Sequence, residues 1–347
     1  MTSSTVAAAV DGGLRPIRLR LALTLVGYGA LALVACVLAP LVGSTSISLT
    51  RVFDRSIPFA DNVDAQIFVL ARLPRVLAGA TVGATLASAG VVLQALLRNP
   101  LATPFTLGVS SGAALGAVLA IAAGATAGLG PFSPVPLSSL ALAFLVSAII
   151  YALATRPGRP MSTDVLLLAG VTLNALVSAL ILLVQYFADF AETYRMLRWL
   201  MGDLDVGGFL PIAAVLPLIV IAFALFATLP SSLNLLSVGL DTAATRGVSV
   251  ARTQRLAFIS TALATSAAVT LSGPVGFVGI VVPHLVRLMT GMDHRIVLPA
   301  SALFGAAFLV GCDLVARTVL APVELPVGIV TAIIGGPFFL WLLVRKA

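Results

Sequence analysis

Two charged residues stand inside an otherwise apolar stretch near the end of the sequence. Asp313 and Arg317 are four residues apart, so in a helix they lie one turn apart on the same face. An acid and a base at this spacing can form an internal ion pair, and charged groups within a membrane are usually functional. No ladder of Asp, Glu or His crosses the apolar runs, which argues against proton- or sodium-coupled transport.

The sequence lacks the residue patterns that are typical of an active site. His284 and His294 are the only histidines, and neither a zinc motif nor a Ser–His–Asp set accompanies them. Cys36 and Cys312 lie far apart in apolar runs. The only lysine is Lys346, so the nucleotide-binding pattern GxxxxGK followed by Ser or Thr is absent. We therefore expect no catalytic residue, metal site or cofactor in this chain, and structural roles for both histidines.

Short polar segments mark both ends of one predicted helix. Arg72 and Arg75 flank Pro74, which suits the first turn of a helix. Cations are disfavoured at a helix N-terminus, so these arginines need an anion, either a lipid phosphate or an acidic partner. At the other end, Pro100 and Pro104 predict a stiff turn at residues 98–104.

The elements that carry these residues are predicted to be membrane-spanning helices. The chain has 347 residues, of which 60% are hydrophobic and only 10% charged, against about 25% charged residues in a soluble domain. Its apolar runs are unbroken, unlike the alternating strands of a membrane barrel. We predict an all-α polytopic membrane protein with about ten spans, at residues 21–42, 73–96, 107–125, 136–154, 164–187, 209–229, 255–273, 275–290, 297–316 and 327–344.

The charge distribution predicts how the chain lies in the membrane. Most of its 20 basic residues fall on the side of the N-terminus, which places both termini in the cytoplasm of a cell whose inner membrane holds the protein. Residues 1–20 form a cytoplasmic segment, and residues 21–347 form a single transmembrane domain. The net charge of +7 is scattered singly, so no nucleic acid is expected as a partner.

Two further features concern the loops. A Ser-Gly-Pro-Val-Gly break at residues 272–276 separates the seventh and eighth spans, and we expect it to be buried among helices. The loop at about 230–255 is rich in leucine, which favours a protein-binding surface over a solvated linker. Within this loop, Asp241 is predicted to cap a short helix that Gly247 ends.

Seven of these segments, taken in order, resemble the permease family of iron-chelate and vitamin B12 importers (FecCD-type). They are residues 72–75 (RLPR), 98–102 (RNPLA), 107–112 (LGVSSG), 273–279 (GPVGFVG), 283–287 (PHLVR), 293–295 (DHR) and 324–328 (ELPVG). The resemblance covers nearly the whole chain after Leu21. It implies the permease fold of a type II ATP-binding-cassette (ABC) importer.

The resemblance also implies roles for particular residues. Arg72, Arg75 and Arg317 match arginines that dock a substrate-binding protein. Asn99, Leu101, Thr163 and Asp164 match the cytoplasmic gates, although Asp164 departs from the small hydroxyl residue expected there. The coupling helices that contact the ATPase match residues 231–247, in particular Leu240, Asp241, Ala244, Arg246 and Gly247.

The function implied by the resemblance depends on partners. A second copy of the chain, two ATPase subunits that hold ATP and Mg, a periplasmic binding protein and the lipid bilayer are expected. The cargo would be an iron complex, haem or a ferric siderophore, moved from periplasm to cytoplasm by alternating access. Cobalamin is the alternative cargo within the same family, and an ion-coupled secondary transporter is the weaker alternative class.

Overall fold

The structure is a computed structural model that describes residues 3–124, 133–155 and 161–346. It is built from helices: α1 (Ser3–Leu38), α2 (Leu49–Val52), α3 (Val63–Gln66), α4 (Leu73–Leu97), α5 (Val109–Ala122), α6 (Pro134–Ala154), α7 (Thr163–Phe187), α8 (Phe190–Leu200), α9 (Leu210–Ala227), α10 (Pro230–Val238), α11 (Leu240–Thr245), α12 (Val250–Ser272), α13 (Val278–Thr290), α14 (His294–Thr318) and α15 (Val327–Lys346).

Each of the ten predicted spans overlaps one of these helices, which confirms the all-α polytopic membrane fold. Within the described residues, 7 helices are long and apolar enough to cross a membrane. Three shorter apolar helices, α5, α13 and most of α15, match the remaining predicted spans. Helix α1 runs from Ser3 to Leu38 without a break, so it includes most of the predicted segment 1–20, whose place in the cytoplasm stays a prediction. Residues 1–2 and the predicted end of the third span, Ala125, lie outside the described residues.

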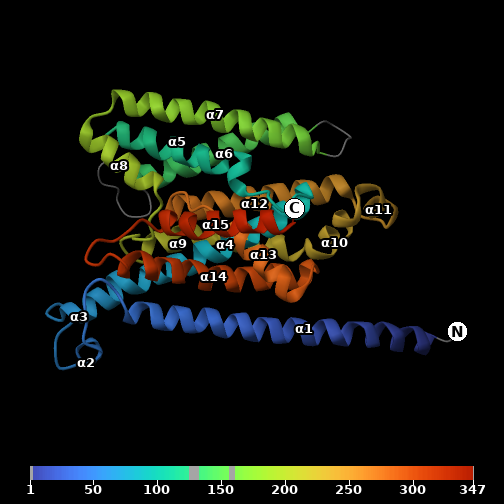
Figure 1. The fold of residues 1–347 in the computed structure, drawn as a ribbon, viewed down its shortest axis with the longest axis horizontal. Helices are drawn as coiled ribbons and strands as arrows, with labels where there is room; N and C mark the ends of the chain where they lie inside the picture. Colours follow the sequence, from blue (N-terminus) through green and yellow to red (C-terminus); the bar gives the residue numbers. More distant parts are fainter. Residues whose placement is uncertain (1–2, 125–132, 156–160, 347) are drawn as a thin grey trace.

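The long helices lie side by side, and α4 occupies the middle of the bundle (Figure 1). It packs against α14, α12, α13 and α1, and most of its residues are buried. The helices α5, α6 and α7 form a group on one side of α12, and α1 lies on the opposite side, against α14 (Figure 1). We call the end that carries α2 and α3 the α3 end, and the end that carries α10 and α11 the α11 end.

Small residues bring α4 and α14 into close backbone contact. A Cβ atom added at Gly83 would lie 2.2 Å from the carbonyl oxygen of Gly305, which no real side chain can do. The glycine- and alanine-rich stretch of α4 therefore serves helix packing, as expected for a bundle in which lipid competes with every apolar contact.

The predicted start of the second span, Leu73, coincides with the start of α4, but helical structure continues on the N-terminal side of it. Arg72 does not stand at a helix N-terminus, because a helix runs without interruption from Val63 to Leu97. Its register changes in a π-helical turn at Ile67–Arg72, immediately before Pro74. Proline has no backbone N–H to donate to the preceding turn, and its ring crowds that turn. The wider π-helical turn before Pro74 accommodates the proline without ending the helix. The predicted conflict between helix dipole and arginine charge therefore does not exist.

The predicted break between the seventh and eighth spans is present and largely buried. Helix α12 ends at Ser272 and α13 begins at Val278. The freed carbonyl of Ser272 accepts a 2.8 Å hydrogen bond from the amide of Asp203, in the segment after α8. A neighbouring segment of the protein therefore supplies the hydrogen bond that this carbonyl needs where the helix ends, as is required inside a membrane.

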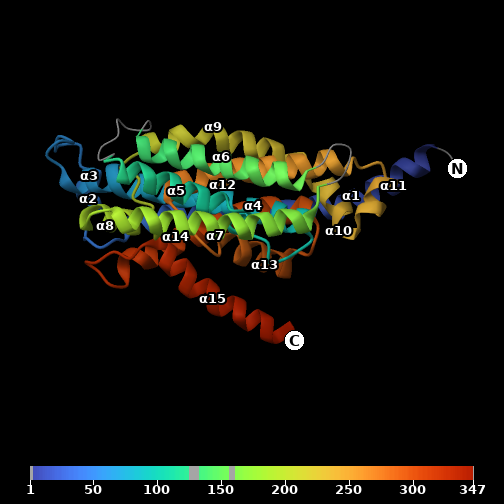
Figure 2. The same ribbon diagram turned by 90° about the horizontal axis from the view of Figure 1, so that it is seen from above.

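Helix α15 leaves the bundle. It contacts α13 and α14 near its start and then diverges from the other helices toward its C-terminal end (Figure 2). Its large apolar side chains Ile333, Leu340 and Val344 are exposed. This helix therefore presents a surface that the rest of the chain does not cover.

Candidate functional site

A cluster of charged side chains lies at the α3 end of the bundle. Arg75 of α4 donates through Nε to Oδ1 of Asp313 on α14, at 2.8 Å. Its Nη1 contacts Oε2 of Glu324, in the segment between α14 and α15. On α14 itself, Nε of Arg317 lies 3.4 Å from Oδ2 of Asp313. The predicted pair of Asp313 and Arg317 is therefore confirmed, and it belongs to a larger network.

The arginines of this cluster are buried and held by backbone carbonyls as well as by carboxylates. Arg72, Arg75 and Arg317 are 6%, 9% and 2% exposed. Arg72 donates to the carbonyls of Pro40 and Thr45, and Arg317 donates to the carbonyl of Ala39 at 2.7 Å. The network thus ties the segment after α1 to α4 and α14.

Glu324 connects this network to the surface. Its side chain is 38% exposed, and its Oε1 accepts a 3.0 Å hydrogen bond from Ser44. Three arginines face two carboxylates here, so the cluster carries one positive charge in excess. Sequence reasoning paired Asp313 with Arg317 but missed Asp313 and Glu324 as partners of Arg75, because only the fold brings these distant residues together.

The predicted gate turn follows α4 at the α11 end. Arg98 adopts a left-handed conformation with φ of 50° and ends the helix. The Oδ1 atom of Asn99 accepts a 2.9 Å hydrogen bond from the amide of Leu101, which fixes the turn. Leu101 is exposed and Asn99 half-buried. The predicted stiff turn is confirmed, while its role as a gate stays a prediction.

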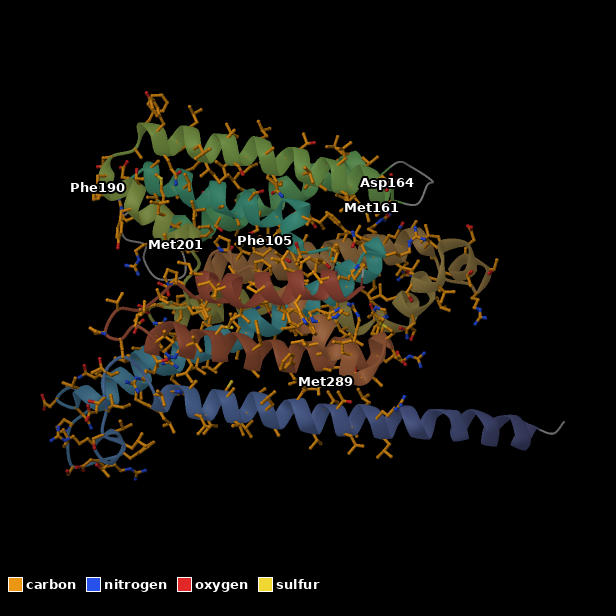
Figure 3. The ribbon with its side chains drawn as sticks, in the orientation of Figure 1. Phe105, Met161, Asp164, Phe190, Met201 and Met289 are labelled. Carbon is orange, nitrogen blue, oxygen red and sulfur yellow. The ribbon has the colours of Figure 1, made fainter. Side chains whose placement is uncertain are left out.

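The second pair of predicted gate residues opens α7. Ser162 caps this helix by accepting a hydrogen bond from the amide of Val165. Thr163 is half-buried, and Asp164 is exposed in the first turn, where the helix dipole favours an acid. Figure 3 shows Asp164 at the same end of the molecule as α10 and α11, and Phe190 at the opposite end. The four predicted gate residues therefore all lie at the α11 end.

The predicted coupling segment forms two short helices, α10 and α11. The prediction that Asp241 is the N-cap is wrong, because Gly239 precedes α11 and Asp241 lies in its first turn. Gly247 has a φ of 83° and follows the helix end, as predicted. Its amide donates to the carbonyl of Ala244 and that of Val248 to the carbonyl of Ala243, which closes the last turn.

The surface of this segment differs from the predicted apolar patch. Leu233 and Leu236 are fully buried and anchor α10 to the bundle, so they explain part of the leucine content. Leu240 is half-buried. The exposed residues include Val238 and four of the predicted coupling residues, Asp241, Ala244, Arg246 and Gly247, and the others are small and polar: Ser231, Ser237, Thr242 and Thr245.

His294 has the structural role expected for it. It begins α14, and its Nδ1 atom lies 2.7 Å from Oδ1 of Asn234 on α10. The same oxygen accepts the backbone amide of His294 at 2.9 Å. Asn234 in turn donates to Asp293 at 2.7 Å. These bonds fix α10, and with it the coupling segment, to the start of α14.

A cavity of about 460 Å³ lies beside α7, lined by residues of α5, α7 and α8. Polar groups meet in it: Ser111 donates to Oδ1 of Asn174 at 2.6 Å, and Asn174 donates to the carbonyl of Phe105 at 2.9 Å. Gln185 also lines it. The signal that could have found this face is the presence of Asn174 and Gln185 within an apolar span.

Comparison with known proteins agrees with this architecture of a multi-pass permease. A profile of the FecCD transport family matches residues 31–345. The chain therefore belongs to the FecCD transport family, whose members are permease subunits of ABC transporters. Permease subunits work with ATPase and substrate-binding partners and are not themselves enzymes.

Relatives and a solved structure support the assignment along most of the chain. The cobalamin import system permease protein BtuC of Halobacterium salinarum is 42% identical over 297 residues, which cover 85% of this chain and 78% of that protein. The hemin transport system permease protein HmuU of Yersinia pestis is 36% identical over 313 residues, covering 88% and 90%. A metal-chelate type ABC transporter in an inward-facing conformation matches with a TM-score of 0.80 and 32% identity, covering 93% of this chain and 99% of that one.

Proposed function

We propose that this chain is the membrane permease of an ABC importer that moves an iron complex, haem or a ferric siderophore, from periplasm to cytoplasm. The observation that carries the proposal is the structural match to a metal-chelate type transporter over 93% of the chain. Cobalamin is the second candidate cargo, favoured by the 42% identity to a cobalamin permease.

The permease acts as a homodimer in the inner membrane, with both termini in the cytoplasm. The dimer proposal rests on α7 and α15, whose large apolar side chains remain exposed along their length. Cargo passes between the two copies, beside the polar groups of the α7 cavity. In alternating access, the helix bundle packs in two ways, one open to each side of the membrane. The partner proteins shift the population between these two states.

The two ends of the bundle have different partners. At the α3 end, Arg72, Arg75 and Arg317 with their excess positive charge attract acidic residues of a periplasmic binding protein. At the α11 end, Leu240, Asp241, Ala244, Arg246 and Gly247 contact the ATPase, which holds ATP and Mg. Asn99, Leu101, Thr163 and Asp164 form the gate beside it, so hydrolysis acts close to the point where cargo leaves.

Reconstitution tests the proposal. The permease is placed in proteoliposomes with its ATPase inside and its binding protein outside, and uptake of labelled cargo is measured with and without ATP. We expect ATP-dependent uptake that an excess of the true cargo suppresses, with haem, a ferric siderophore and cobalamin compared as competitors. Uptake driven by a cation gradient without ATP would overturn the proposal in favour of a secondary transporter.

A further inference from the structure

A second cavity, of about 810 Å³, lies at the α11 end between α4, α13 and α15. It is distinct from the cavity beside α7. Its polar lining consists of Gln94, Arg98, Ser237, His284, Arg287 and His294. Among the residues that the structure describes, none of those that line the cavity is acidic. The cavity therefore offers positive charge and hydrogen-bond donors without a carboxylate to neutralise them.

Arg287 is the fixed cation of this cavity. It is half-buried on α13, and its Nη1 donates to Oε1 of Gln94. Gln94 is itself buried and donates through Nε2 to the carbonyl of Gly279 at 2.9 Å. In the part of the chain that the structure describes, no carboxylate lies within ion-pair distance of Arg287. A guanidinium partly removed from water without a counter-ion is costly, so an anion in the cavity would stabilise it.

Arg98 supplies a second cation. The helix α4 ends at Leu97, and the left-handed conformation of Arg98 turns the chain so that the amide of Asn99 donates to the carbonyl of Gln94 at 3.1 Å. This turn sets Arg98 on the wall of the same cavity as Arg287. Two guanidiniums in the lining of one cavity suit a phosphate group, because each can donate two parallel hydrogen bonds to its oxygens.

The surroundings indicate that the phosphate belongs to a lipid. The cavity lies where α4 and α13 end and α14 begins, so it is at the ends of apolar helices and not at their middle. Leu288 and Met292 on its wall are 67% and 74% exposed, so they can cover an acyl chain. Trp341 also lines it, and tryptophan is enriched at the level of lipid headgroups.

We propose that this cavity binds the phosphate of an anionic phospholipid from the cytoplasmic leaflet, with Arg287 and Arg98 as its ligands. Basic pockets between transmembrane helices on this side of a membrane are suited to such headgroups. The lipid would fill the space between α15 and the bundle. It would thereby support the diverging helix at its cytoplasmic end.

Binding is measured on the purified full-length chain. In nanodiscs of phosphatidylcholine, replacement of part of the lipid by phosphatidylglycerol should raise the thermal unfolding temperature of the wild-type protein. Arg287→Gln and Arg98→Gln should each weaken phosphatidylglycerol binding about tenfold, the equivalent of one charge-assisted contact. Arg252→Gln, which replaces an exposed arginine of α12 outside the cavity, should leave binding unchanged.

Native mass spectrometry of the wild-type chain gives a test that does not depend on the folding of any variant. From mixed micelles, the chain should retain phosphatidylglycerol in preference to phosphatidylcholine. Equal retention of the two lipids would overturn the proposal, as would equal losses of affinity in Arg252→Gln and the two cavity variants. Stabilisation by inorganic phosphate as strong as that by phosphatidylglycerol would show a free-anion site and overturn the lipid assignment.

Discussion

Arg75 and Asp313 form a 2.8 Å ion pair that joins α4 to α14 across the interior of the bundle, although 238 positions separate them in the sequence. Asp313 is 1% exposed and also faces Arg317. A buried charge that loses its partner is strongly destabilising, because its desolvation is no longer compensated. The pair therefore predicts how the fold responds when the carboxylate is removed.

Asp313→Asn should lower the free energy of unfolding by about 3–5 kcal/mol, because the buried Arg317 loses its carboxylate partner and Arg75 keeps only that of Glu324. Thermal unfolding in nanodiscs measures this change. Asp203→Asn is the matched control, since the pair of Asp203 with Arg198 is exposed and its loss should cost at most about 1 kcal/mol. Equal, small effects of the two variants would contradict the structural role of the cluster.

The same variant separates the two transport classes. In an ATP-driven permease, the Asp313→Asn molecules that remain folded should still take up cargo when ATP is supplied. An ion-coupled carrier would need this carboxylate for coupling and would lose transport entirely. Uptake per folded molecule, with folded protein quantified by gel filtration, distinguishes the two outcomes.

Arg72→Gln tests the proposed docking of the binding protein. Arg72 donates hydrogen bonds to two backbone carbonyls, so glutamine can keep a hydrogen bond while it removes the charge. We expect about tenfold weaker binding of the substrate-binding protein, with less dependence on salt. Arg51→Gln, an exposed arginine of α2, is the control, and equal effects of both variants would indicate general charge attraction instead of a docking site.

The outcome for these arginines shows what sequence alone can and cannot give. The spacing of Asp313 and Arg317 is local, so a helix brings them together and their pairing could be predicted. Arg75 and Glu324 join them only through tertiary packing, which no spacing encodes. Pro74 lies in the first turn of α4, as predicted, but a π-helical turn at Ile67–Arg72 precedes it and the continuous helical stretch begins at Val63. Ten apolar spans, by contrast, follow from composition and length.

The coupling segment illustrates the same limit at shorter range. A leucine-rich loop suggested an exposed patch, but Leu233 and Leu236 are core residues of α10. The sequence pattern could not distinguish these buried leucines from a docking surface, because their burial depends on contacts with distant parts of the chain. One such contact joins α10 to the start of α14, where Asn234 accepts a hydrogen bond from His294 across 60 positions. Only the fold shows which face of the segment is open.

Ala243 and Ala244 allow this open face to be tested with adjacent residues. Ala243 is fully buried and Ala244 is exposed on α11. Ala244→Trp should leave the unfolding temperature unchanged but lower ATPase affinity at least tenfold, since a bulky side chain in a packed interface excludes the partner. Ala243→Trp should instead destabilise the permease itself. Normal ATPase binding by Ala244→Trp would contradict the assignment of α11 as a coupling helix.

Close approach of α4 and α14 gives the final prediction. A Cβ atom at Gly305 would lie 2.4 Å from the carbonyl oxygen of Gly83 and 2.6 Å from Cβ of Ala87. Gly305→Ala should therefore force the helices apart and cost about 1–3 kcal/mol, as overpacking does. Gly311→Ala lies on the same helix with nothing within 4 Å of its new Cβ, so it should be neutral or stabilising by about 0.5–1 kcal/mol. Thermal unfolding compares the two, and equal unfolding temperatures would show that backbone contact does not determine the packing of α4 on α14.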